Sequence, residues 1–216
     1  LTINVSGVVN ELTVDTANGN DIVNVIANGG TGNLTLNTGN GADQIEVQST
    51  NSLGDISINS GSGADQIDFI NSGVNNTVNI DTGLDAARVD ITLQGQMNNF
   101  RLDADSGIDA LIVLIDATVR SADGITEAVI IDLGPQDESV VDLTVSDAAF
   151  IEAMSLTTGP GEDLVSLELA GNIVALNSSS DAFRLLTSDG QDDIRITFIG
   201  NIEGSYLNGG FSADSY

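Results

Sequence analysis

Five aspartates close short glycine-rich segments and are the residues of this chain best suited to bind a metal: Asp21, Asp43, Asp65, Asp163 and Asp192. Three of these segments, Thr38–Asp43, Ser60–Asp65 and Thr158–Asp163, read Thr/Ser-Gly-x-Gly-x-Asp. Their glycines permit backbone angles that a side chain would forbid, so each segment can reverse the chain tightly. Carboxylates and backbone carbonyls are the oxygen ligands that Ca²⁺ prefers.

Stacking of these turns would bring their carboxylates together. Asp21, Asp43 and Asp65 would then stand roughly one strand spacing apart, and like charges directly opposite one another are destabilising unless compensated. A Ca²⁺ ion taking oxygens from two successive turns would relieve the repulsion, with the backbone carbonyls of Gly19, Gly41 and Gly63 as further ligands. The column is interrupted at Ala87, which takes the place of the aspartate in the turn after Asp65.

The segments resemble the haemolysin-type (RTX) calcium-binding nonapeptide, Gly-Gly-x-Gly-x-Asp-x-apolar-x. In that family, stacked turns hold Ca²⁺ with Asp carboxylates and backbone carbonyls. Here Thr or Ser replaces the first Gly, and the turns recur at a longer period than the family's nonapeptide. The resemblance covers about ten residues per coil in roughly five coils, so it implies a local turn chemistry and not an RTX roll.

A second interpretation of the turns needs no metal. The closing Asp can accept hydrogen bonds from local backbone amides and so stabilise the chain reversal. The sequence leaves both interpretations open, and Ca²⁺ is the only cofactor that it suggests.

The elements that carry these turns follow a strict 22-residue repeat. Apolar residues alternate with polar ones, as in strands, in segments that recur at 12–16, 34–38, 56–60, 78–82 and 100–104. A second strand-like pair follows each turn at a fixed offset, for example Val23 and Val25, then Ile45 and Val47. Exact repetition places each strand beside its counterpart one coil away. We therefore predict an all-β, right-handed parallel β-helix of about eight to nine coils.

The repeat also predicts the domain organisation. Residues 1–216 form one β-helix domain, with a half coil over 1–11, regular coils over 12–115, and wider coils with a tail over 116–216. The connections around 116–128, 145–153 and 170–182 have gained residues. Because Leu1 already lies inside a strand-like pattern, we expect the chain to be a piece of something longer or a processed product.

Composition narrows the classes of function. The chain has 32 acidic residues against 5 basic ones, all of them Arg, and a formal net charge of −27. Such a surface repels nucleic acid and anionic membranes, and no apolar run approaches membrane-spanning length. Without Cys there is no disulfide, thiol nucleophile or zinc–thiolate site.

An enzyme is the main alternative class, because many β-helices cleave polysaccharides. Arg184 and Arg195 flank the turn that ends at Asp192 and form the one Arg–acid cluster that spacing suggests. Aromatic residues are only 4% of the chain, with no Trp or His. We therefore predict no catalytic residues.

The outward-facing residues of the strands could present a binding surface. On the second strand of each coil, the outward residues Asn24, Glu46, Asp68 and Asp90 form an acidic column that changes to Ile112. We expect Ile112 and Leu114 to pack under the connection 116–128, with a partner-binding surface as the alternative.

The sequence thus favours a non-catalytic structural or adhesive β-solenoid module of a secreted or cell-surface bacterial protein, similar in turn motif and composition to the repeat regions of large bacterial exoproteins and adhesins. Its expected partners are neighbouring domains or subunits at the coil ends and a surface glycan or protein ligand. A carbohydrate-active lyase or hydrolase is the alternative, and a self-assembling filament or surface-layer subunit is a third interpretation.

Overall fold

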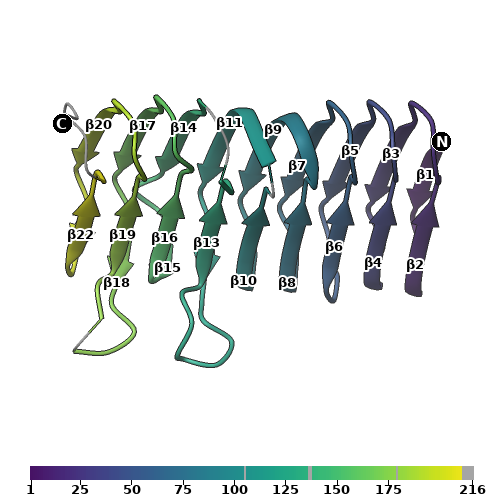
Figure 1. The fold of residues 1–216 in the computed structure, drawn as a ribbon. Helices are drawn as coiled ribbons and strands as arrows, with labels where there is room; N and C mark the ends of the chain where they lie inside the picture. The colour runs from purple at the N-terminus through teal and green to yellow at the C-terminus, as the bar shows by residue number, and fades with distance from the viewer. Residues whose placement is uncertain (105, 136–137, 179, 211–216) are drawn as a thin grey trace.

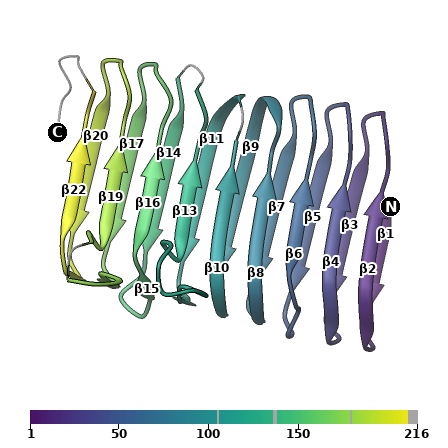
Figure 2. The same cartoon turned by 60° about the horizontal axis from the view of Figure 1, so that its bottom comes forward.

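A computed structural model gives the fold of the chain as a parallel β-helix whose coils stack along one axis from the N-terminus to the C-terminus (Figures 1 and 2). It describes residues 1–104, 106–135, 138–178 and 180–210, and of Thr31 and residues 106–109 only the backbone. The last residues of the expected tail, 211–216, lie outside the described part. The described residues include no helix of the length and apolar character that a bilayer-spanning segment would need.

One side of the stack is a nine-stranded parallel sheet, here sheet 1. Its strands, in both spatial and chain order, are β1 (Thr2–Val5), β3 (Ile22–Ala27), β5 (Gln44–Ser49), β7 (Gln66–Asn71), β9 (Leu84–Leu93), β11 (Ser106–Ile115), β14 (Val140–Val145), β17 (Leu164–Leu169) and β20 (Asp193–Phe198).

The opposite side, sheet 2, begins as one column of strands and then divides. The undivided part contains β2 (Val9–Asp15), β4 (Thr31–Asn37), β6 (Ile56–Asn59), β8 (Val74–Asp81) and β10 (Gln96–Asp103). One branch continues with β12 (Thr118–Val119), β15 (Phe150–Glu152), β18 (Asn172–Val174) and β21 (Asn201–Ile202). The other contains β13 (Val129–Asp132), β16 (Met154–Thr157), β19 (Phe183–Leu186) and β22 (Ser205–Asn208).

The register confirms the predicted repeat. Val23 pairs with Ile45, and Ile45 pairs with Ile67, so the 22-residue step is kept from coil to coil. Between the two end coils, the inward positions are mostly apolar and buried, with Phe69 and Phe100 among the largest fully buried side chains. The alternation of apolar and polar residues therefore places one face of every strand in a continuous core.

The wider coils of the second half arise where sheet 2 divides. Strand β10 pairs through its first residues with β12 and through its last residues with β13. The connection 120–128 separates β12 from β13 and projects from the stack, as does the connection after β18 (Figure 1). Between β15 and β16 a single residue, Ala153, makes the same break with a left-handed φ of 61°.

One expectation about packing is wrong. Ile112 is 42% exposed on the outer face of sheet 1 and is not covered by the connection 116–128. That connection contains β12 and leads into β13, both in sheet 2, so it lies on the other side of the stack.

Candidate functional site

The repeated turns between sheet 2 and sheet 1 have the backbone geometry that their glycines allow. Gly39, Gly61 and Gly83 have φ of 93°, 87° and 62°, in the left-handed region. A Cβ at Gly61 would lie 1.8 Å from the carbonyl oxygen of Gly39 in the preceding coil. Ala17 occupies the same position at φ 66° in the first turn, which has no described turn stacked on its N-terminal side. Glycine is thus required by close stacking as well as by φ.

The closing aspartates of the turns connect successive coils. The backbone N–H of Asp21 donates to Oδ1 of Asp43 at 2.8 Å, and the N–H of Asp43 donates to Oδ1 of Asp65 at 2.9 Å. The same bond recurs in the second half, where the N–H of Asp163 donates to Oδ1 of Asp192 at 3.1 Å. These five side chains form what we call the Asp ladder, defined as Asp21, Asp43, Asp65, Asp163 and Asp192. It occurs as two separate runs, because Ala87 interrupts the column after Asp65.

A row of hydroxyls accompanies the Asp ladder at the start of each turn. The Thr38 hydroxyl donates to the Ser60 carbonyl at 3.0 Å, and the Ser60 hydroxyl donates to the Thr82 carbonyl at 3.1 Å. The Thr82 and Thr158 hydroxyls are also buried but have no hydrogen-bond partner among the described residues. Hydroxyl and carboxylate together thus satisfy backbone groups of the neighbouring coil.

The other carboxylate oxygen of each ladder aspartate, Oδ2, has no such hydrogen bond from the described residues. Within the described part of the chain, Oδ2 of all five aspartates is shielded from solvent and makes no hydrogen bond of good geometry. Burial raises the pKa of Asp65 above its ordinary value, while the amide of Asp43 and the Ser60 hydroxyl oppose the rise. Burial likewise raises the pKa of Asp163, and the Asp192 carboxylate adds to that rise. At Asp65 and Asp163, burial therefore favours the neutral carboxyl over the charged one.

These donors fit Ca²⁺ poorly. Ca²⁺ takes six to eight oxygen ligands, whereas two successive turns offer one free Oδ2 each, because each Oδ1 receives an amide hydrogen bond. The carbonyl oxygens of Gly19 and Gly41 are packed closely against the stacked glycine of the next coil, because a Cβ at Gly41 or Gly63 would lie 2.0 Å from them. Asp43 and Asp65 are only 1% and 3% exposed, which leaves little access for water ligands. No group of three or more acidic residues able to hold a metal occurs in the described ranges. The geometry favours the turn-stabilising interpretation, and a calcium site stays a prediction.

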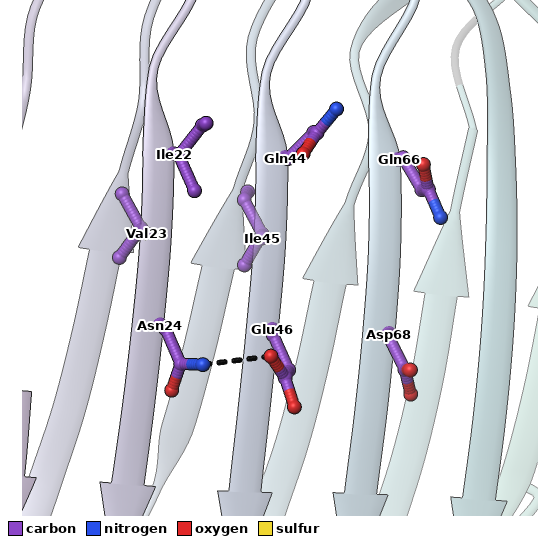
Figure 3. Close-up of a pocket in the computed structure, with 8 residues that line it drawn as sticks. All are labelled: Ile22, Val23, Asn24, Gln44, Ile45, Glu46, Gln66 and Asp68. Atoms are coloured by element: carbon purple, nitrogen blue, oxygen red, sulfur yellow. Dashed lines mark hydrogen bonds between the residues drawn. The ribbon is translucent and has the colours of Figure 1, made fainter. Parts of the chain in front are cut away.

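The acidic column predicted on sheet 1 is present, and a shallow depression of about 180 Å³ lies over its first half (Figure 3). Asn24 donates to Glu46 at 2.7 Å, and Asp68 stands next to Glu46 on the following strand. Partial burial raises the pKa of Asp68, with further contributions from Asp90 and Glu46. Asp90 is paired with Arg88 at 3.0 Å. The depression thus offers carboxylates and side-chain amides next to the exposed Ile22.

The Arg–acid cluster suggested by spacing is not formed. Arg184 lies on β19 in sheet 2, whereas Arg195 lies on β20 in sheet 1 and pairs with Asp193 at 2.6 Å. Asp192 is buried in the turn between them.

The structure instead forms contacts that the spacing did not indicate. Arg120 pairs with Glu152 at 2.8 Å and stacks over Phe150, and Arg184 lies 5.7 Å from the ring centre of Tyr206. Sequence reasoning missed these contacts because they join residues across the lengthened coils, where no fixed offset relates them.

Comparisons of the chain with protein-family models, with curated proteins and with solved structures give no match. The function proposed below therefore rests on the residues and their geometry.

Proposed function

We propose that this chain is a non-catalytic structural and adhesive β-solenoid module of a secreted or cell-surface bacterial protein. The observation that carries the proposal is the in-register stacking of outward polar residues into long columns, of which Asn24, Glu46, Asp68 and Asp90 are the clearest. Such columns repeat polar, oxygen-bearing side chains at the strand spacing of roughly 4.8 Å, which suits a repetitive ligand or surface.

The arginines support a non-catalytic function. Arg88, Arg101 and Arg195 each pair with an aspartate two residues away on the same strand. These local pairs serve as charge compensation on an acidic surface and do not converge on one reacting centre.

The coil ends are the proposed contacts with neighbouring domains or subunits. In the last coil, the inward residues Phe198 and Leu207 remain 45% and 41% exposed. Strands β20 and β22 pair on one side only among the described strands. Unpaired edges of this kind favour stacking of a further strand layer.

Retention under flow tests this function. Beads coated with the protein are passed over immobilised bacterial cell envelopes and over extracted exopolysaccharide, and the eluate is assayed for newly formed reducing ends. We expect the beads to be retained without release of reducing ends. Absence of retention on both surfaces, or steady production of reducing ends, would contradict an adhesive, non-catalytic module.

A further inference from the structure

The outer face of sheet 2 in the second half differs from the rest of the surface. Strands β16, β19 and β22 pair in register and project two outward residues each, which are Ser155 and Thr157, Arg184 and Leu186, and Tyr206 and Asn208. This face combines an arginine, an exposed aromatic ring, apolar surface and hydroxyl groups. We call these six residues the β16–β19–β22 face.

Arg184 is the arginine on this surface with unused hydrogen-bonding capacity. Its Nη1 is 3.9 Å from Glu127, which is beyond hydrogen-bond distance. Its Nε is shielded from solvent and has no partner among the described residues. By contrast, Arg101 and Arg195 hydrogen-bond their neighbouring aspartates at 2.6 Å. A ligand hydroxyl placed beside this pair could accept from Arg184 and donate to Glu127 at ordinary hydrogen-bond distances.

Next to Arg184 lies an aromatic platform. The Tyr206 ring stands 5.7 Å from the Arg184 guanidinium, and Tyr206 is 44% exposed. An exposed ring held beside a guanidinium offers an apolar face together with hydrogen-bond donors.

A separate depression of about 490 Å³ lies further along the same strands. Leu186 and Asn208 line it and lie two residues beyond Arg184 and Tyr206, on the same faces of β19 and β22. Its other lining residues include Thr157, Pro160, Ser188 and Asp189. The lining therefore combines apolar surface with hydroxyl and amide groups and one carboxylate.

We infer that the β16–β19–β22 face, together with Glu127, Pro160 and Ser188, binds a neutral oligosaccharide. Sugar rings present an apolar face, which Tyr206, Leu186 and Pro160 can cover, and hydroxyls at their edges, which the polar side chains can pair. A polyanionic glycan is disfavoured because the chain carries a net charge of −27. This inference rests on the proposed adhesive function and names the class of ligand.

Binding of defined oligosaccharides tests the inference. The purified protein is titrated, with saturation-transfer NMR and calorimetry, against cellotetraose, laminaritetraose, mannotetraose and chitotetraose, and against tetragalacturonate as the acidic probe. We expect at least one neutral tetrasaccharide to bind and the acidic one not to bind. Arg184→Ala and Tyr206→Ala should each weaken binding about tenfold, the effect of losing a central contact.

Two controls make the result specific. Arg195→Ala removes the same charge from the opposite sheet and should leave the affinity unchanged, and Tyr206→Phe keeps the ring and should retain binding. Thermal melting of each variant checks that the fold persists. Failure of all neutral probes, or equal loss in Arg184→Ala and Arg195→Ala, overturns the inference. If beads of the Arg184→Ala variant are still retained under flow, the adhesive function stands and this binding site falls.

Discussion

Oδ1 of Asp43 accepts a 2.8 Å hydrogen bond from the backbone amide of Asp21, one coil earlier in the chain. The pairing repeats between Asp43 and Asp65, so both aspartates stabilise the coil before their own. This arrangement predicts that the acceptor oxygen is needed for stability and that the negative charge is not.

Substitution at Asp65 separates these two properties. Asp65→Ala removes the acceptor of the Asp43 amide and should lower the free energy of unfolding by about 1–3 kcal/mol, the cost of an unsatisfied buried donor. Asp65→Asn keeps Oδ1 and removes the charge, so its free energy of unfolding should equal that of the wild type or exceed it by up to about 1 kcal/mol. Urea unfolding measures both variants. Equal destabilisation by Asn and Ala would mean that the charge itself is needed.

The same burial predicts stabilisation by mild acid. The pKa values of Asp65 and Asp163 are raised in the folded chain, so the folded state binds more protons than the unfolded state between those raised values and the ordinary value of 3.8. Stability should therefore rise as the pH falls through the raised pKa values of the folded state and level off below the ordinary value of 3.8.

Calorimetric melting across that pH range checks this prediction, with the double variant Asp65→Asn, Asp163→Asn as the control. The melting temperature of the double variant should depend less on pH, because the two carboxyls with raised pKa values are gone. The dependence that remains comes from the other acidic groups. A steady fall in the melting temperature of the wild type as the pH falls over the same range would contradict the assignment.

The stacked glycines give a matched pair of variants. Gly61→Ala places a Cβ against the Gly39 carbonyl and should destabilise the chain by about 3 kcal/mol or more. Ala17→Gly, at the same position of the first turn, should leave the free energy of unfolding within about 1 kcal/mol of the wild type. The glycine removes the strain of a left-handed alanine, but it also raises the backbone entropy of the unfolded chain, and the two effects oppose each other. Guanidinium unfolding measures both. A harmless Gly61→Ala would show that the turns stack more loosely.

Much of this fold could be predicted because the 22-residue repeat is exact over residues 12–115. In the regular coils, a strict 22-residue spacing fixes the neighbour of each strand, so the pairing of Ile45 with Ile67 follows from sequence. The division of sheet 2 did not follow, because an insertion near Arg120 has no offset that assigns it to a sheet. For the same reason, the exposure of Ile112 was predicted wrongly.

The sequence predicted the stacking of the ladder aspartates but not the hydrogen bonds of their oxygens. Spacing shows that Asp43 and Asp65 stack, but it does not show where each oxygen points, and the choice between metal ligand and amide acceptor depends on that direction. Likewise, Arg184 and Arg195 are near in sequence, yet the turn between them places them on opposite sheets.

Thermal melting with and without calcium tests most directly whether the Gly-x-Gly-x-Asp turns are held together by amide–carboxylate hydrogen bonds. The wild type is melted in EDTA and in excess CaCl₂ at equal ionic strength, beside Asp65→Asn. We predict the same melting temperature in both solutions for each protein. A higher melting temperature in CaCl₂ that is lost in EDTA and absent in Asp65→Asn would contradict the account and establish the turns as a calcium site.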